Sequence, residues 1–391
     1  MRLLYVIDSL SPGGAETSLA SMASGLVSKG LEMHVLPLSQ SRLTLAPQLE
    51  ASGVEVHHRT RPHGRRGNVE AVVDVARDIQ PDLIHTTLYE ADIAGRVAAM
   101  LRRIPASTSI VNDSYSTSHY RESNTVKLHA ARALDSVTGL SAVRFHAITE
   151  AIARQVGPRL GIRRSKIDVI PRGRDPLAFP YRAAAARRRI RQELRLGDDA
   201  RVLLAIGRHE PQKGLQHLLG AVPHVAAQHP GLVVLLAGKE GRTTHALQSL
   251  AAQTGVDVRF LGHRTDIADL LTAADVFCFP SEREGFGGVL VEAMAVGCPV
   301  VASAIPTSVE VLAGATDHPV GLLAPVGEVS GLVEALDRVL TDRVASDERA
   351  RLGRERFERL YTIDAVVGQM IGFFERAVLE GTASGKRQRQ A

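Results

Sequence analysis

One stretch of the chain places two acids on either side of a glycine-rich turn. Glu284 and Glu292 stand with seven residues between them, and the turn holds Gly285, Gly287 and Gly288. Glycine lets a ligand approach the backbone because no Cβ stands in the way. A helix that begins here directs free N–H groups and the positive end of its dipole at an anion. The stretch therefore predicts an anionic ligand whose hydroxyl groups the acids hold, and an ordinary strand-to-helix connection with solvated acids is the alternative.

Two cations follow another apolar run, residues 202–206. Arg208 and Lys213 come after Gly207, at a spacing that lets both reach the start of one helix. Arginine offers a planar fork to phosphate oxygens, and lysine offers a compact charge. Two cations beside one helix N-terminus favour a diphosphate over a carboxylate as the ligand. The alternative is a pair of surface cations in a loop.

These segments resemble the donor half of retaining nucleotide-sugar glycosyltransferases, and more narrowly family 4, which has the two-domain GT-B fold. Three motifs carry the resemblance in order: Gly207-Arg-x4-Lys-Gly214, Glu284-Gly-Phe-Gly with Glu292 behind it, and Gly297-Cys-Pro-Val-Val301. The resemblance covers nearly the whole chain and is strongest over residues 202–325. It implies a nucleoside-diphosphate-sugar donor and a sugar-containing or small-molecule acceptor.

The resemblance also implies roles for single residues. Arg208 and Lys213 would bind the diphosphate and stabilise the charge of the leaving group, a large electrostatic effect in catalysis. Glu292 resembles the acid that holds the ribose, and Glu284 the acid that contacts the transferred sugar. The usual proposal for this class is front-face transfer, in which the leaving phosphate oxygen takes the acceptor's proton. The donor would also meet the backbone of the turn, at Gly285, Phe286, Gly287, Gly288 and Val289.

Two further pairs are expected near the donor. Gly13 and Gly14 follow the first predicted strand without the Gly-x-Gly-x-x-Gly spacing of dinucleotide enzymes, which disfavours a nicotinamide cofactor. The family has a glycine pair here that meets the diphosphate, and a bare turn is the alternative. By family position, Arg264 and Asp266 lie near the base, which leaves UDP, GDP and ADP undistinguished.

The chain departs from the family on the acceptor side. After the fifth predicted strand the family often carries a histidine near the reacting sugar, and Val111 or Asn112 stands there in this chain. An amide positions a hydroxyl by hydrogen bonds but cannot shuttle a proton as imidazole does. Other histidines could substitute, chiefly His85, with His119 and His146 behind it, and for each of them a structural or solvated role is favoured over a catalytic one. The residues expected on the acceptor side are His85, Asn112, Tyr115 and His119.

Composition bounds these expectations. The chain has 391 residues, a formal net charge of +5 and two cysteines, Cys278 and Cys298, which we expect to be reduced core thiols. No Asp-x-Asp occurs, which argues against a bivalent metal, so the donor is a substrate and no cofactor is expected. We expect no nucleic-acid partner. Arginine clusters such as residues 59–66 would suit solvent or an anionic membrane surface.

Short apolar runs alternate with amphipathic helical patterns in both halves. This alternation predicts an α/β fold with two parallel sheets, each covered on both faces, and ligands at the carboxyl ends of the strands. With the resemblance, the expected order is a Rossmann-like acceptor domain over 1–178 and a Rossmann-like donor domain over 179–361. A crossover helix over 362–380 would pack on the first domain, and a polar tail over 381–391 would end the chain.

The leading function is a retaining, metal-independent glycosyltransferase of the hexosyltransferase type. A non-catalytic GT-B partner that binds a nucleotide sugar is the main alternative, ahead of a phosphorylase, an epimerase or a dehydrogenase. The apolar run at the N-terminus is too short for a signal peptide, and no run approaches the ~20 residues of a membrane span. We therefore expect a cytoplasmic protein, and peripheral association with the inner face of the membrane stays open. The sequence does not fix the acceptor, the sugar or the oligomeric state.

Overall fold

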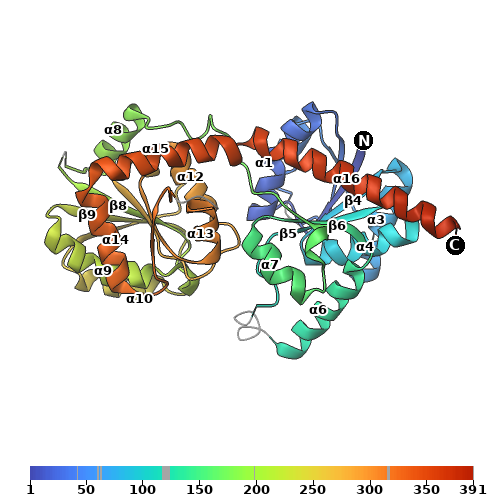
Figure 1. The fold of residues 1–391 in the computed structure, drawn as a ribbon, viewed down its shortest axis with the longest axis horizontal. Coiled ribbons are helices and arrows are strands. Elements are labelled where there is room, and N and C mark those ends of the chain that lie inside the picture. The colour runs from blue at the N-terminus through green and yellow to red at the C-terminus, as the bar shows by residue number, and fades with distance from the viewer. Residues whose placement is uncertain are drawn as a thin grey trace. The chain divides into compact units, whose positions relative to one another are not determined.

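The computed structural model describes residues 1–41, 43–59, 61, 64–116, 124–197, 199–314 and 318–390, with side chains described as far as residue 383. It divides into two compact units (Figure 1). Unit 1 comprises Met1–Gly173 and Ile363–Ala391, and unit 2 comprises Arg174–Thr362. The division lies before the expected boundary at 178 because the Arg174 N–H donates to the Tyr361 carbonyl at 2.8 Å.

Unit 1 is built on a parallel sheet of seven strands in the order β3-β2-β1-β4-β5-β6-β7. Its strands are β1 Arg2–Ile7, β2 Glu32–Pro37, β3 Glu55–Val56, β4 Leu83–Thr87, β5 Ala106–Ile110, β6 Ala142–Ala147 and β7 Ile167–Val169. Its helices are α1 Gly14–Ser28, α2 Ala46–Ala51, α3 Arg65–Ile79, α4 Tyr89–Arg102, α6 Thr125–Gly139, α7 Glu150–Arg159 and α16 Ile363–Gln390.

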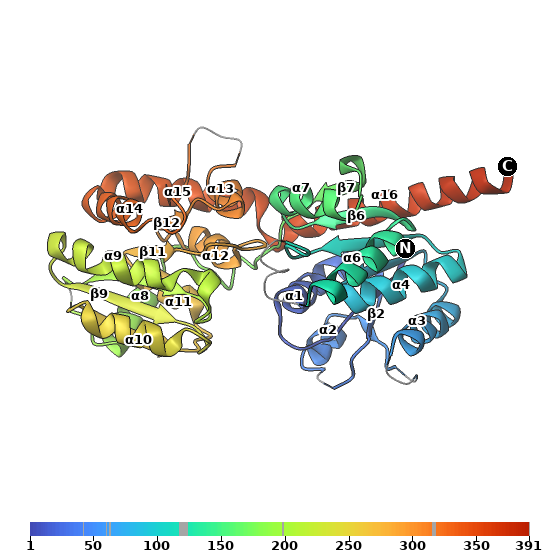
Figure 2. The same ribbon diagram turned by 90° about the horizontal axis from the view of Figure 1, so that it is seen from below.

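Strand alternation divides the core of unit 1 between the two faces of the sheet. On β1, Leu3, Tyr5 and Ile7 join the apolar cluster under α1 and α16. Leu4 and Val6 point to the other face, where α3 and α4 pack side by side (Figure 2). Both faces of the sheet are therefore covered, as the alternating sequence pattern predicts.

The C-terminal helix α16 packs on unit 1, which confirms the predicted crossover. Val366, Met370, Phe373, Phe374 and Ala377 recur at helical spacing and are buried in the same cluster as α1. The helix continues to Gln390, ten residues past the expected end at 380. The expected polar tail is thus helical, since its lysine, arginine and glutamine residues are good helix formers.

Unit 2 repeats the plan with a six-stranded parallel sheet in the order β10-β9-β8-β11-β12-β13. Its strands are β8 Arg201–Ile206, β9 Leu232–Ala237, β10 Asp257–Gly262, β11 Val276–Phe279, β12 Val300–Ser303 and β13 Leu322–Ala324. Its helices are α8 Ala184–Glu193, α9 Leu215–Gln228, α10 Thr244–Gln253, α11 Ile267–Ala273, α12 Gly288–Val296, α13 Pro306–Leu312, α14 Val329–Thr341 and α15 Arg343–Leu360.

The strand order of unit 2 reverses between β8 and β11. The chain leaves β8 toward β9 and returns on its other side as β11, so the loops after these two strands part at the carboxyl edge. Such a switch point is where open α/β sheets bind ligands. Among the described residues, no helix is both long enough and apolar enough to cross a lipid bilayer.

Candidate active site

The loops that follow β8 and β11 interlock at the switch point of unit 2. The Glu282 N–H donates to the Gln212 carbonyl at 2.9 Å, which ties one loop to the other. Gly214 has a φ of 63°, and a Cβ at this position would overlap the Pro280 carbonyl oxygen. Only glycine fits this left-handed, crowded position. The sequence thus brings together the two loops that carry the predicted donor residues.

The side chains of these two loops also meet in an ion pair of Lys213 and Glu284. Both side chains are largely buried, at 19% and 17% exposure. The Ser281 hydroxyl donates to Glu284 Oε1 at 3.1 Å, so the carboxylate is held from two sides. Two residues that are 71 positions apart in sequence therefore present one cation and one acceptor at the same spot.

Arg208 lies just after β8, and its side chain differs from that of Lys213 in its exposure and its contacts. Its side chain is exposed, and it forms no hydrogen bond or ion pair with any residue in the described part of the chain. Its backbone is held, since its carbonyl accepts from the Glu210 N–H at 2.7 Å. The guanidinium is thus free to bind an anion without first giving up a partner.

The helix α12 begins directly after the second loop. Its N-cap, Gly287, has a φ of 76° and provides no side-chain cap, so the first-turn N–H groups stay available to a ligand. The Phe286 ring is buried in unit 2, 6.2 Å from the Tyr361 ring between centroids. At this position only the backbone is left for a ligand. Val289 lies in the first turn, half-buried.

Glu292 lies one turn into α12 and pairs with an arginine from the start of unit 2. The Arg174 Nε–H donates to Glu292 Oε1 at 2.7 Å, with 24% and 13% of the two side chains exposed. A Cβ at Gly288 would overlap the Arg174 guanidinium, so the glycine admits this side chain to the helix N-terminus. The positive end of α12 thus carries an arginine and an acid together.

Arg264 and Asp266 lie after β10 and form a fork-to-fork pair. The guanidinium donates to the two carboxylate oxygens at 2.8 and 2.6 Å, and it also reaches Glu193 of α8 at 2.9 Å. Hydrogen bonds from these acids raise the pKa of Arg264. Arg264 therefore binds two carboxylates of its own unit, and a contact between its side chain and a base stays a prediction.

The glycine pair of unit 1 begins α1. A Cβ at Gly14 would lie 2.6 Å from the Arg172 guanidinium, and one at Gly13 would lie 2.5 Å from Glu16 Oε2. The Ser9 hydroxyl donates to the same Glu16 carboxylate at 3.1 Å. Glycine here makes room for an arginine at the N-terminus of α1, as Gly288 does at α12.

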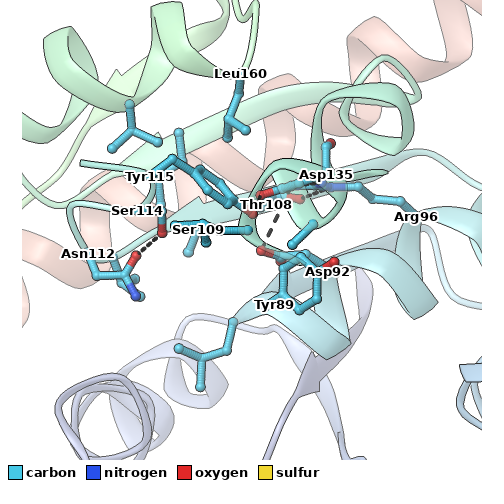
Figure 3. A pocket seen from close by; sticks show the side chains of 16 residues that line it. Tyr89, Asp92, Arg96, Thr108, Ser109, Asn112, Ser114, Tyr115, Asp135 and Leu160 are labelled. Atoms are coloured by element: carbon cyan, nitrogen blue, oxygen red, sulfur yellow. Dashed lines mark hydrogen bonds and ion pairs between the residues drawn. The ribbon is translucent and has the colours of Figure 1, made fainter. Parts of the chain in front are cut away.

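Unit 1 also contains a pocket of about 290 Å³ at the carboxyl ends of β4 and β5 (Figure 3). One wall is polar and contains Arg96, which is 1% exposed. Its guanidinium donates to Asp135 Oδ1 at 2.6 Å and to the Thr108 hydroxyl at 3.0 Å. The Tyr115 hydroxyl donates to the other Asp135 oxygen at 2.9 Å. Apolar side chains also line the pocket and include Leu128, Val156 and Leu160.

Two polar atoms of this pocket are buried without a partner among the described residues. They are the Tyr89 hydroxyl and Asp92 Oδ1. Burial raises the pKa of Asp92 to about 8, although Arg96 lowers it. An unpartnered buried polar atom is costly, so these two atoms favour a ligand or water in the pocket.

Backbone strain is found at the same place. Leu88 and Tyr115 both line the pocket and have φ values of 79° and 60°, in the left-handed region that non-glycine residues avoid. Such residues gather at ligand-binding sites. The predicted acceptor-side residue Asn112 lies beside them, and its amide oxygen accepts from the Ser114 hydroxyl at 2.5 Å.

The structure corrects the expectation for His85. The side chain is fully buried among Tyr5, Phe373 and Phe374, and its two ring nitrogens bind serine hydroxyls at 2.8 Å each. Burial holds its pKa well below the ordinary value, so it is neutral and satisfied. His85 therefore supports the core and does not reach an acceptor. His119 lies outside the described residues.

Sequence reasoning missed five charged residues at these sites. Arg172 and Arg174 belong to a segment that we interpreted only as a domain boundary. Two arginines in a chain with two helices that begin at glycine residues could have indicated these contacts. The others lie inside helices, where charges usually face solvent, and no pattern marked them: Asp92, Arg96 and Asp135.

The comparisons with known proteins agree with this geometry. A model described as glycosyl transferases group 1 matches residues 186–359, and one described as a glycosyl transferase 4-like domain matches residues 13–173. A phosphatidyl-myo-inositol mannosyltransferase of Mycobacterium leprae is 35% identical over 186 residues, 46% of this chain and 48% of that protein. A glycogen synthase of Mycobacterium tuberculosis is 35% identical over 241 residues, 60% of this chain and 53% of that protein. The match spans about half the length of these relatives.

Solved structures are similar over nearly the whole chain. Anabaena HepE in complex with UDP superposes with a TM-score of 0.82 and 22% identity, covering 96% of this chain and all of that one. A sucrose-phosphate synthase of Thermosynechococcus elongatus gives 0.77 and 20%, with 96% and 99% covered. At this identity the likeness shows the fold. The two family models together reach from Gly13 to Arg359, and the chain belongs to the group 1 glycosyltransferases, as a family 4-type member with the GT-B fold.

Proposed function

We propose that this chain is a retaining hexosyltransferase that moves a hexose from a nucleoside-diphosphate sugar to an acceptor hydroxyl. The observation that carries the proposal is the arrangement at the switch point of unit 2. There Arg208, the Lys213–Glu284 pair and the open N-terminus of α12 lie on the loops of adjacent strands. Cations and a helix N-terminus bind phosphate, and a held carboxylate accepts from sugar hydroxyls.

In this proposal the charge of the leaving diphosphate is met by protein groups. Lys213 has three N–H donors, so it can keep Glu284 and still donate to a phosphate oxygen. Arg208 adds a planar guanidinium that forms no hydrogen bond or ion pair with the described residues. Fixed donors at the position where negative charge develops stabilise the transition state without reorganisation. Glu284 then binds the hexose, and Glu292, held by Arg174, binds the ribose.

Front-face transfer suits this set of residues. The acceptor hydroxyl attacks on the face from which the diphosphate leaves, and the leaving phosphate oxygen takes its proton. No protein base is needed in that step, which fits the asparagine at position 112. Donor identity follows the relatives only as far as a hexose, since they are named for mannosyl transfer and glycogen synthesis. UDP is the first nucleoside diphosphate to test because HepE was solved with UDP.

For the acceptor we propose an uncharged hydroxyl-bearing group that fills the pocket of unit 1. Arg96 is the one cation among the described lining residues, and Asp135 already binds it. Among the described lining residues, a phosphate would therefore find no cation that is not already paired. This distinguishes the chain from relatives named for D-inositol 3-phosphate. The apolar wall suits a sugar face or an aglycone.

The test is a release assay with UDP-glucose, UDP-galactose, GDP-mannose and ADP-glucose, followed by product NMR. Release of nucleoside diphosphate that disappears in Lys213→Ala, with a product that keeps the anomeric configuration of the donor, supports the proposal. An inverted product would refute retention. A chain that binds a nucleotide sugar but releases nothing with any acceptor would be the non-catalytic partner.

A further inference from the structure

A cluster of metal-ligating side chains lies at the edge of the unit 1 sheet, away from the pocket. The parallel pairing of β2 and β3 sets His34 opposite Glu55. His57 follows Glu55 by two residues, and Glu32 precedes His34 by two. Because side chains alternate along a strand, all four stand on one face of the sheet.

The distances within this cluster match a tetrahedral ion. His34 Nδ1 and His57 Nε2 are 3.0 Å apart. Glu55 places one oxygen 3.3 Å from His34 Nδ1 and the other 3.6 Å from His57 Nε2. A tetrahedral site with ligand bonds of about 2.0–2.1 Å needs donor atoms about 3.3–3.4 Å apart. Of the three separations, the one of 3.0 Å is shorter than this range, the one of 3.3 Å lies within it and the one of 3.6 Å is longer. Small side-chain movements would therefore complete the tetrahedral geometry.

A second carboxylate orients one of the histidines. Glu32 Oε1 lies 3.3 Å from His34 Nε2, where it accepts the ring N–H, and the Arg2 Nε–H holds the same oxygen at 2.7 Å. With the proton on Nε2, the Nδ1 lone pair faces His57 and Glu55. Metal-binding histidines usually donate their other N–H to a carboxylate in this way. His34 is also 5% exposed, so its ring is fixed by packing.

We propose that His34, Glu55 and His57 bind one first-row transition-metal ion, with Zn²⁺ as the preferred ion. Two imidazole nitrogens and one carboxylate oxygen are a common zinc donor set. The Glu55 side chain is 65% exposed, which leaves the fourth position open to water. The inference does not depend on the proposed function. His34 lies in the first half of β2, and the cluster is separate from the pocket at the carboxyl ends of β4 and β5, so the proposal gives the ion no part in sugar transfer.

The ion would stabilise a weak part of unit 1. β3 has only two residues and forms the edge of the sheet. The chain then leads to Arg59, whose guanidinium donates to the Leu38 carbonyl at 3.0 Å and to Asn68 Oδ1 at 2.5 Å. A metal that joins β3 to β2 would therefore also help to fix the position of Arg59, which lines an open hollow together with Asp8.

The test uses the full chain, freed of metal with a chelator and titrated with ZnCl₂ and CoCl₂. We expect one ion per chain and the visible absorption of tetrahedral Co²⁺. His57→Ala and Glu55→Gln should each weaken Zn²⁺ binding more than 100-fold. Glu32→Gln should weaken it about 10–100-fold, the usual effect of losing an orienting partner.

His58→Ala is the matched control. His58 is an exposed neighbour that contacts Gln40 and not the cluster, so its loss should leave the affinity unchanged. Each variant changes an exposed or half-buried side chain, and circular dichroism confirms that it is folded. A native chain that retains no Zn²⁺, or one whose affinity is the same in His57→Ala and Glu55→Gln, would overturn the proposal.

Discussion

The two units share a plan but place their charges differently. In unit 2, Arg208, Lys213 and Glu284 of the candidate site stand on loops at the carboxyl edge of the sheet, and the Arg208 side chain has no hydrogen-bond or ion-pair partner among the described residues. In unit 1, the pocket charges stand inside helices, where Arg96 and Asp135 are buried and bound to each other. Under the proposed function, charge in unit 2 is placed to bind a ligand, whereas charge in unit 1 is paired within the wall of a cavity.

One short segment serves both arrangements. Arg172 lies at the glycine-started N-terminus of α1 in unit 1, and Arg174 lies at that of α12 in unit 2. Each arginine adds positive charge to the positive end of a helix. That combination is unfavourable unless an anion is bound, or an acid such as Glu292 lies close by. Removing one charge at a time from each unit therefore shows whether that charge contributes to folding or to function.

The largest expected effect comes from the buried network of unit 1. Arg96→Met leaves the Asp135 carboxylate buried with Tyr115 as its remaining hydrogen-bond donor from the pocket wall. Breaking a buried ion pair by removing one partner costs about 3–5 kcal/mol. We expect a fall in melting temperature of roughly 6–20 °C, measured by circular dichroism.

The control for this change is Arg351→Met. Arg351 lies on α15 with exposed partners, so its loss should leave the melting temperature almost unchanged. Equal melting temperatures for the two variants would show that the unit 1 network does not support the fold.

The next largest effect is on turnover. Lys213→Ala should lower kcat about 10²–10³-fold, the usual effect of removing a fixed donor from a developing oxyanion. Its melting temperature should also fall, because the variant leaves the largely buried Glu284 carboxylate without its cation, so turnover is measured at a temperature where the variant is folded. Steady-state release of nucleoside diphosphate measures this. Normal turnover in the variant would remove Lys213 from the proposed site.

A smaller effect is the pH dependence due to Asp92. Burial raises the pKa of Asp92 to about 8, so between about pH 4 and 8 the folded chain keeps a proton that the unfolded chain releases. The stability from this group is therefore complete below about pH 4 and is lost as pH rises toward 8, by at most about 1.4 kcal/mol per pH unit.

Asp92→Asn isolates this dependence, because the amide resembles the protonated acid and does not titrate. The stability of the native chain relative to the variant should fall from pH 5 to pH 8. Urea unfolding at both values, followed by circular dichroism because the chain has no tryptophan, gives the difference. The same difference at both pH values would mean that Asp92 is ionised throughout.

The smallest effect is expected at Glu193. Glu193→Gln removes one of the two acids on Arg264, a partly exposed ion pair worth about 0–1 kcal/mol. Affinity for UDP should not change, since Asp266 still holds the guanidinium. A clear gain in affinity would instead show that Arg264 binds the nucleotide when it is released.

The sequence predicted what depends on local pattern. Alternating apolar runs located the strands of the unit 1 sheet and all strands of the unit 2 sheet except β13. The resemblance implied that the last helix packs on the first domain. The glycine turns located the loop charges of unit 2, because a ligand-binding loop needs particular residues at short spacing. In unit 2 the interlocking of the two loops follows from Gly214, whose φ and contact with Pro280 exclude other residues.

What the sequence did not show depends on pairing across long separations. Arg96 of α4 and Asp135 of α6 form an ion pair between the two helices. In the sequence, each residue alone is typical of a charged side chain on a helix surface. His34 and Glu55 meet only because β2 and β3 pair in that register. Burial explains why the acceptor-side role considered for His85 was wrong, since His85 stands in the middle of β4 and packs under α16.

The most direct test of the central claim is calorimetric titration of the native chain and of Arg208→Ala with UDP, GDP and ADP. We expect one of the three nucleoside diphosphates to bind, with one molecule per chain. Arg208→Ala should weaken that binding about 10–150-fold, as expected for a lost charged hydrogen bond of about 1.5–3 kcal/mol. Asp92→Asn in unit 1 should leave it unchanged. Binding that is equally tight without Arg208, or no binding of any nucleoside diphosphate, would contradict a donor site at the switch point of unit 2.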